Sequence, residues 1–269
     1  MKSLICLIVY LLSYPLFAYD FITIQSTTSI RDSGFYKYIL EQYKKESETI
    51  LKFIAVGTGQ AIKNSQKCDA DLLFVHHKLS EQKFVDNGYG LYRKNVMYND
   101  YILIGPNDDP AGIKTKKNIT EAFKIIHENK HPFVSRGDNS GTYLKEQELW
   151  DLSKINFDKR KSSWYRESGS GMGASLNFAV NIGAYILSDR STWISFGNKK
   201  NHVIVFENGP LLVNNYGIIP ISPKICPEVK LKEAEEFVNW LTSERGKKLI
   251  NKFRVNNQQI FYSTNKFIE

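Results

Sequence analysis

The stretch Phe21-Ile22-Thr23-Ile24-Gln25-Ser26-Thr27-Thr28-Ser29 begins the pattern that defines the fold. Its first four residues predict a β-strand, because β-branched and aromatic residues predominate in them. Short polar residues follow, and after Gly34 the apolar residues recur at helical spacing, at Phe35, Tyr38, Ile39 and Tyr43. A strand, a polar turn and a helix in this order form the repeating unit of an α/β protein.

The same unit recurs along the chain. A second strand is predicted over 51–56, and Gly57-Thr58-Gly59-Gln60 opens the helix that follows it. Further strands are predicted over 71–75, 101–105, 133–135, 202–206 and 216–221. Helices are predicted over 119–128, from the loop at 136–142 through Trp150, and over 172–179, 184–187 and 230–253. We expect an α/β fold with mainly parallel strands.

The N-terminus predicts export. A basic start at Lys2 precedes an apolar run from Leu4 to Leu12, and Ala18 offers a small residue for cleavage. A retained membrane anchor is the alternative, but the run is short for a bilayer and Pro15 interrupts it. We expect a signal peptide over residues 1–18 and a mature chain from about Tyr19.

Composition excludes several classes of protein. The 269 residues are 42% hydrophobic and 24% charged, which excludes a disordered or collagen-like chain. The net charge of +8 attracts anions, but the basic residues are interspersed with acidic ones, so no nucleic-acid partner is expected. Three cysteines exclude a four-cysteine zinc site. Once Cys6 is removed with the signal, Cys68 and Cys226 either pair or remain two separate thiols.

Three segments place hydroxyls and glycines where a predicted strand gives way to a helix. They are Gln25-Ser26-Thr27-Thr28-Ser29, Gly57-Thr58-Gly59-Gln60-Ala61 and Ser135 to Thr142. Ligands of open α/β sheets bind outside the carboxyl ends of strands, where helix N-termini present free N–H groups. Hydroxyls add donors without charge, and Arg136 adds a cation whose donor fork suits oxyanions. Together the segments predict an anion site.

Each segment also has a purely structural interpretation. Serine and threonine at helix starts are commonly N-caps. Arg136 could be a surface salt-bridge partner, and Asp138 could cap the next helix or pair with Arg136. The presence of three such segments in one exported chain favours the ligand site.

Enzyme signatures are weak. His76 and His77 are adjacent at a strand end, so their side chains point to opposite faces and do not share a metal. Residues 169–174 fit G-x-G-x-x-A, but residues 162–166 before them make a poor strand for a dinucleotide site. We expect no catalytic residues, no metal ligands and no cofactor. An exported enzyme remains the alternative from another class of protein.

The motifs together resemble the tungstate-binding proteins of ABC importers, the TupA type. Ser26-Thr27-Thr28-Ser29 departs from that family's Thr-Thr-Thr-Ser at the first position only, and Val56 to Ala61 matches its Val-Gly-Thr-Gly-Gln-Ala. Ser135 to Thr142 matches a third motif, and segments 69–76, 164–173 and 215–219 resemble further ones. The resemblance covers nearly the whole mature chain.

The resemblance implies a type II periplasmic-binding-protein-like fold, in which two crossover strands join two α/β lobes around a ligand cleft. Lobe one would comprise residues 19–104 plus 216–269, and lobe two residues 105–215. The implied protein is a periplasmic monomer that delivers its ligand to the permease subunits of an ABC transporter. A receptor that signals instead of transporting is a further alternative.

The resemblance also implies particular site residues. Carried over residue by residue, the expected ligand contacts are Thr27, Thr28, Thr58, Arg136 and Thr142, helped by Ser140 and Gly141. Ser29 is a further candidate, and Ser26 keeps a hydroxyl at the one altered position.

The donor-rich chemistry of the first two segments favours a fully deprotonated oxyanion as the ligand. Tungstate, molybdate and sulfate accept hydrogen bonds only, whereas hydrogen phosphate keeps a proton and favours a carboxylate acceptor. Asp138 is the one acid near the three segments. Phosphate-binding proteins share an Arg-x-Asp-x-Ser-Gly-Thr run, so it is Gly57-Thr58-Gly59-Gln60 that favours tungstate. A molybdate or phosphate receptor of the same fold is the alternative within binding proteins.

Overall fold

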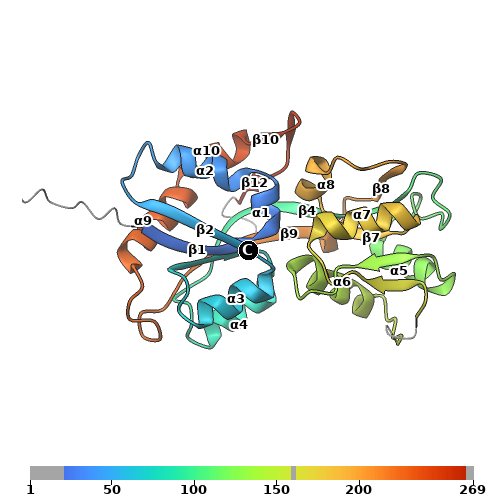
Figure 1. The fold of residues 1–269 in the computed structure, drawn as a ribbon, viewed down its shortest axis with the longest axis horizontal. Coiled ribbons are helices and arrows are strands. Elements are labelled where there is room, and N and C mark those ends of the chain that lie inside the picture. The colour runs from blue at the N-terminus through green and yellow to red at the C-terminus, as the bar shows by residue number, and fades with distance from the viewer. Residues whose placement is uncertain (1–20, 159–161, 265–269) are drawn as a thin grey trace, which may run out of the picture.

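Two groups of elements lie side by side in the computed structural model, joined by strands β4 (Lys94–Pro106) and β9 (Val213–Pro220) (Figure 1). The structure describes residues 21–158 and 162–264, so the signal peptide expected over 1–18 lies outside the described residues. We call the group that contains the first strand lobe one and the other group lobe two. Within the described ranges, no helix is both long enough and apolar enough to cross a membrane.

Each lobe is built from its own strands and helices. Lobe one holds β1 (Phe21–Thr27), α1 (Thr28–Asp32), α2 (Phe35–Tyr43), β2 (Ile50–Val56), α3 (Thr58–Gln66), β3 (Leu72–Val75), α4 (Lys78–Asp86), α9 (Leu231–Thr242), α10 (Glu244–Lys252), β10 (Arg254–Val255), β11 (Gln258–Gln259) and β12 (Tyr262–Ser263). Lobe two holds α5 (Ile119–Glu128), β5 (Phe133–Ser135), α6 (Gly141–Leu152), β6 (Tyr165–Glu167), α7 (Met172–Ile182), β7 (Ile186–Asp189), α8 (Arg190–Ser195) and β8 (His202–Phe206).

The main sheet is mixed, which corrects the expectation of mainly parallel strands. Its order is β12-β4-β9-β3-β1-β2, with β7 and β8 also paired to β4. β1 runs parallel to β2 and β3, but β9 runs antiparallel to β3 and β4, as do β7 and β8 to β4. Strands that are joined by a helical crossover run parallel, as β1, β2 and β3 do. β9 comes from a distant part of the chain and is not bound by that rule, and it runs antiparallel to β3 and β4.

Strand β4 passes from one lobe to the other. Residues 94–100 pair with β9, and residues 101–106 pair with β7 and β8. The expected lobe boundary at 104–105 therefore falls within the part of β4 that pairs with β7 and β8. The division into 19–104 plus 216–269 and 105–215 stays a proposal.

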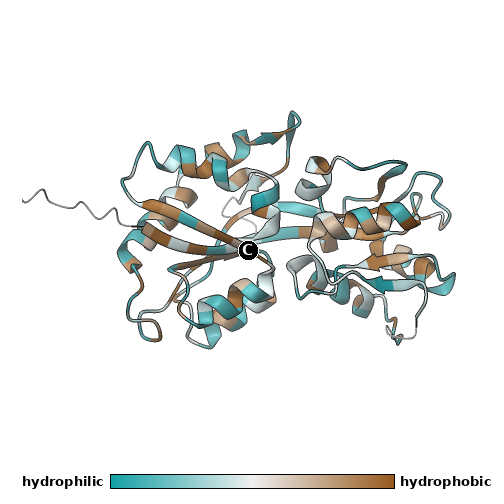
Figure 2. Ribbon diagram, in the orientation of Figure 1, coloured by the Kyte–Doolittle hydropathy of each residue, from teal (hydrophilic) through white to brown (hydrophobic). Residues whose placement is uncertain are grey.

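Separate clusters of buried apolar side chains support the two lobes. Phe35, Phe237 and Phe261 are buried in lobe one, where helices α2, α9 and α10 supply much of the cluster. Phe133 and Trp150 are buried in lobe two, with ring centroids 5.3 Å apart. Figure 2 shows apolar residues concentrated on strands β1 and β2 and polar residues on the faces of the surrounding helices. Each lobe therefore has a core of its own, and Ile194 of α8 in lobe two also packs in the lobe-one cluster.

Two predicted helices differ in the structure. Residues 186–187, expected within a helix, belong to strand β7, because a short apolar run does not distinguish a buried strand from a helix. The predicted helical stretch 230–253 is two helices, α9 and α10. Ser243 ends the first and caps the second, its hydroxyl accepting from Gly246 N at 3.2 Å.

A disulfide joins Cys68 to Cys226 and settles the question that the sequence left open. The two Cα atoms lie 5.4 Å apart, and the cysteines are separated by 158 residues in sequence. Cys68 follows the C-terminal end of α3, and Cys226 follows β9. The bond therefore ties the helix that opens at Thr58 to the C-terminal part of lobe one.

Candidate anion-binding site

The carboxyl ends of β1 and β2 form the lobe-one side of the site. Thr27 is in register with Val56, so it lies beside Gly57 and Thr58 at the start of α3. Thr27 and Thr58 are 2% and 0% exposed, and within the described ranges their Oγ1 atoms have no hydrogen-bond partner. Neither hydroxyl caps its helix by a side-chain hydrogen bond, so capping does not explain them.

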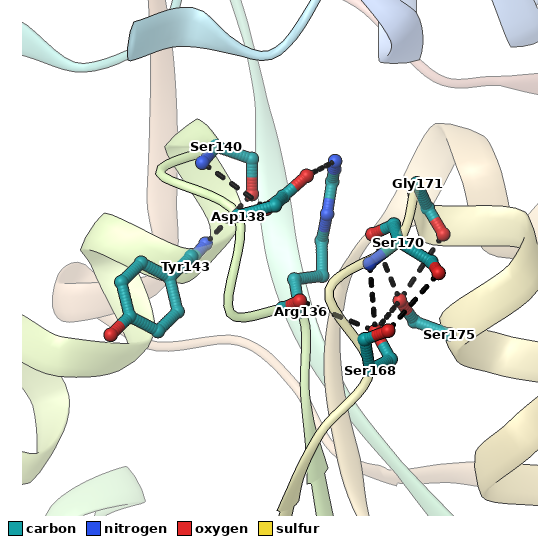
Figure 3. A network of polar contacts seen from close by, with 8 residues as sticks. All are labelled: Arg136, Asp138, Ser140, Tyr143, Ser168, Ser170, Gly171 and Ser175. Atoms are coloured by element: carbon teal, nitrogen blue, oxygen red, sulfur yellow. Dashed lines mark hydrogen bonds and ion pairs between the residues drawn. The ribbon is translucent and has the colours of Figure 1, made fainter.

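The loop after β5 forms the lobe-two side (Figure 3). Arg136 is 3% exposed and forms an ion pair with Asp138 through Nη2. The other carboxylate oxygen of Asp138 accepts from Ser140 N at 3.2 Å. Asp138 thus pairs with the arginine and also holds the turn before α6. The Nε of Arg136 is buried and makes no hydrogen bond to any described residue.

Helix α6 adds three predicted site residues. Ser140 is its N-cap, and its Oγ accepts from Tyr143 N at 3.2 Å. Gly141 and Thr142 form the first turn, and Thr142 is 1% exposed. The Thr142 Oγ1 is buried without a partner in the described part of the chain. Capping therefore explains the hydroxyl of Ser140 but not that of Thr142.

The two sides meet directly. Gly59 N donates to the carbonyl oxygen of Asn139 at 3.1 Å, which links α3 to the loop before α6. A Cβ built on Gly57 would lie 3.7 Å from Ser140 Cα, and one built on Gly141 would lie 3.0 Å from Thr58 Oγ1. The structure thus brings Thr58, Arg136, Ser140, Gly141 and Thr142 to one junction between the lobes, with Thr27 beside it on the lobe-one edge.

The remaining candidates differ from this group. Thr28 is only partly buried, at the first position of α1. Ser26 is in strand β1, and its Oγ donates to the carbonyl oxygen of Phe74 at 2.8 Å, so this hydroxyl braces the sheet. Ser29 is buried within α1. The predicted polar turn begins later than expected, because β1 continues to Thr27.

A fourth segment, Ser168 to Gly171, flanks Arg136 and was missed as a site element. Ser168 Oγ donates to the carbonyl oxygen of Arg136 at 3.2 Å and lies 2.7 Å from Ser175 Oγ (Figure 3). The sequence carries a signal for it, the glycines at 169, 171 and 173, but this pattern fits a dinucleotide motif as well as a family motif. Strand β6, which leads into it, has only three residues, so the strand-turn-helix pattern was faint.

Helix N-termini supply backbone donors to the junction. Helices α3, α6 and α7 begin at Thr58, Gly141 and Met172, and all three of these described helices lack an acidic residue in the first turn. Their free N–H groups and dipoles favour an anion. Besides these neutral donors, the loop before α6 brings the Arg136 guanidinium, which is paired with the Asp138 carboxylate.

Closure around this junction should depend on Gly59. A Cβ at this position would lie 2.9 Å from the carbonyl oxygen of Asn139, so Gly59→Ala should hold the lobes apart and weaken anion binding by roughly tenfold or more. Gly197→Ala is the matched control, since a Cβ there meets nothing within 4 Å. Isothermal titration calorimetry measures both variants. Equal affinities for the two would show that α3 and the Asn139 loop do not touch in the bound protein.

His76 is a buried histidine close to this junction. It is 4% exposed, and burial lowers its pKa to about 4, with nearby Asp189 opposing the shift. The imidazole is therefore neutral at pH 7. The described residues contain no group of three or more potential metal ligands.

The lowered pKa of His76 should make the protein sensitive to acid. The unfolded chain binds a proton on this histidine below about pH 6.5, whereas the folded protein resists until about pH 4, so stability falls as pH drops through this window. We expect the free energy of unfolding to fall by up to about 3 kcal/mol more in wild type than in His76→Gln. Urea denaturation at pH 7 and pH 4.5 measures the difference. His131→Gln, which alters another histidine, should retain the wild-type loss, and an equal loss in His76→Gln would contradict the prediction.

Two α/β lobes, joined by two strands and meeting at buried donors from both, define the class of the periplasmic binding proteins. Residues 20–245 match the PBP superfamily domain. A tungstate-binding protein TupA of Peptoclostridium acidaminophilum is 39% identical over 86% of this chain and 81% of its own length. The chain therefore belongs to the PBP superfamily and, within it, to the family of the TupA proteins.

Solved structures agree with this family. The tungstate binding protein TupA from Desulfovibrio alaskensis G20 is 36% identical, with a TM-score of 0.79 over 91% of this chain and 99% of that one. The tungstate ABC transporter protein from Geobacter sulfurreducens is 40% identical, with a TM-score of 0.78 over 87% of this chain and 98% of that one. These comparisons confirm the expected periplasmic-binding-protein-like α/β fold. The names of these relatives describe binding and transport proteins.

Proposed function

We propose that this protein is the tungstate receptor of an ABC importer and holds the oxyanion between its two lobes. One observation supports the proposal: on the two sides of the junction, Thr27, Thr58, Thr142 and Arg136 each have a buried side-chain donor atom that makes no hydrogen bond to any described residue. Leaving such groups unsatisfied costs about 1–3 kcal/mol each, so an anion that accepts from them stabilises the closed form.

The bonds that the Asp138 carboxylate already makes favour a fully deprotonated ligand. Asp138 is the acidic side chain within the loop, and its two oxygens are engaged by Arg136 and by Ser140 N. A hydrogen phosphate would need an acceptor for its proton, and the bonds from Arg136 and Ser140 N reduce, without exhausting, the capacity of Asp138 to supply one. Tungstate, molybdate and sulfate need donors only. The names of the relatives favour tungstate, and molybdate of similar size is the competing ligand.

The proposed setting is the periplasm. The expected signal peptide would export the chain, and the receptor would then deliver its ligand to the permease subunits. The proposed contacts are Thr27, Thr28, Thr58, Arg136 and Thr142, with Ser140 and Gly141 in support. Backbone N–H groups at the start of α7 would complete the donor set.

Calorimetry on the mature chain tests this function. Tungstate, molybdate, sulfate and phosphate are titrated separately into ligand-free protein at pH 7, and each is then used to displace the others. We expect tight binding of tungstate, with phosphate far weaker. Tight phosphate binding with no heat from tungstate would overturn the proposal. An unfolding temperature that does not rise with any oxyanion, in a protein that turns over a substrate, would revive the enzyme alternative.

A further inference from the structure

The imidazole of His76 lies where β3 ends and contacts both strands that connect the lobes. Its Nδ1 is 3.0 Å from the hydroxyl oxygen of Tyr101 on β4 and 3.0 Å from Oδ1 of Asn214 on β9. Asn214 in turn donates through Nδ2 to Oδ1 of Asn99 at 2.7 Å, which turns its own Oδ1 toward the histidine. The Nδ1 therefore carries the proton and donates. The ring also packs on Tyr216 of β9, with centroids 4.8 Å apart.

The same ring touches lobe two. A Cβ built on Gly141 would lie 2.6 Å from Cε1 and 2.8 Å from Nδ1 of His76. Gly141 is the first residue of α6, between the Ser140 cap and Thr142. The helix N-terminus can approach the histidine only because residue 141 has no side chain. A residue of lobe one thus packs against a ligand segment of lobe two.

We propose that His76 is a positioning residue that couples closure of the lobes to the placement of the α6 segment. The inference rests on the proposed function. When the lobes rotate about β4 and β9, the hydrogen bonds to Tyr101 and Asn214 and the contact with Gly141 must change together. His76 itself makes no hydrogen bond to the ligand in this role. It stabilises the closed arrangement, in which Thr142 and Arg136 face Thr58.

The chemistry of His76 fits a positioning role better than an ionic contact with the ligand. Its low pKa keeps the imidazole neutral at pH 7, so it supplies directed hydrogen bonds rather than charge. Arg136, which is close enough to lower that pKa further, already provides the cation. Because the neutral imidazole bonds to a residue on each connecting strand, movement of either strand should break one of its hydrogen bonds.

Kinetics separate this role from direct ligand contact. In His76→Ala, tungstate should dissociate about tenfold faster, because a buried hydrogen-bonded contact of the closed form is lost, while the association rate stays within about twofold. His202→Ala is the matched control, since His202 is also buried but bonds to the Ala184 carbonyl oxygen inside lobe two. Small-angle X-ray scattering with saturating tungstate should show a larger radius of gyration for His76→Ala than for the control.

A double variant tests the contact itself. Gly141→Ala should weaken tungstate binding because its methyl group meets the His76 ring, and adding His76→Ala should restore part of that loss. Restoration is specific to contact between the two residues and does not follow from general destabilisation. If His76→Ala does not fold, His76→Gln and the Gly141→Ala single variant are measured by the same kinetics.

The outcomes distinguish the two proposals. Wild-type protein that binds no oxyanion refutes the receptor function. Wild-type protein that binds tungstate, together with an unchanged dissociation rate in the folded His76 variant or no rescue in the double variant, refutes the coupling alone.

Discussion

Replacing Arg136 with alanine should weaken tungstate binding by roughly 100-fold to 1,000-fold. The guanidinium is buried, its Nε has no partner among the described residues, and it is the charged donor that lobe two brings to the junction. Its loss also leaves Asp138 without its counter-ion at the place where a dianion must bind, so repulsion adds to the missing attraction. Calorimetry with tungstate measures the affinity, and thermal unfolding shows whether the variant is folded.

Two companion variants sharpen this experiment. Arg31→Ala removes an exposed arginine that pairs with its neighbour Asp32, and its affinity should remain within about twofold of wild type. Arg136→Lys keeps the charge but loses the planar donor fork, so it should fall between wild type and alanine. If folded Arg136→Ala binds as tightly as Arg31→Ala, Arg136 does not belong to the site.

Removing the disulfide should produce the largest loss of stability. Cys68→Ser combined with Cys226→Ser opens a covalent loop that spans a separation of 158 residues. Loop-closure entropy gives about 5 kcal/mol for a loop of that length, and measured losses for native disulfides are typically about 2–5 kcal/mol. Urea denaturation of the double variant should therefore show a clearly lower midpoint.

Tungstate affinity serves as a control for the disulfide experiment. The bond lies beyond the C-terminal end of α3, whereas Thr58 begins the helix, so tungstate affinity at 25 °C should change little. Wild-type protein treated with a reductant should match the double variant, because Cys68 is exposed and accessible. A double variant as stable as wild type would show that the bond adds nothing to folding.

Most of the helices and strands can be predicted from local sequence patterns. The others depend on pairing with strands that are distant in sequence. Helix α5 and strand β5 lie where apolar periodicity placed them, since their patterns depend on neighbours in sequence. Strand β4 is far longer than the expected 101–105, because Lys94 to Asp100 look polar and are strand only through their pairing with β9. Strand β7 was mistaken for helix because its short apolar run carries no period. The antiparallel ladders are set by contacts between distant segments, which no local pattern encodes.

The candidate site likewise contains residues that local sequence predicts and a contact that depends on distant segments. Thr27, Thr58 and Thr142 are predictable because hydroxyl residues that follow strands gather at one edge of a sheet, and Arg136 because its donor fork suits oxyanions. Each has a buried donor atom without a partner among the described residues, which fits that prediction. Ser140, predicted as a supporting ligand contact, is the N-cap of α6, which is the structural alternative for a serine at a helix start. The contact of His76 with Gly141 could not be predicted, since it joins different lobes. From the sequence, His76 is considered as a metal ligand, as a residue of the enzyme alternative and as the end of the family-like segment 69–76, but not as a contact between the lobes.

The position of β9 within the main sheet has a consequence for the order of folding. β9 lies between β3 and β4, so neither strand has its neighbour on that side until residues 213–220 have been synthesised. The α5–α8 part of the chain, in contrast, is nearly continuous in sequence and can collapse early. Until β9 arrives, the apolar edges of β3 and β4 are open to pairing with other chains. The part of the chain from residue 213 onward therefore completes the lobe that the first residues began, and a chain truncated before residue 213 should aggregate rather than form a smaller stable receptor.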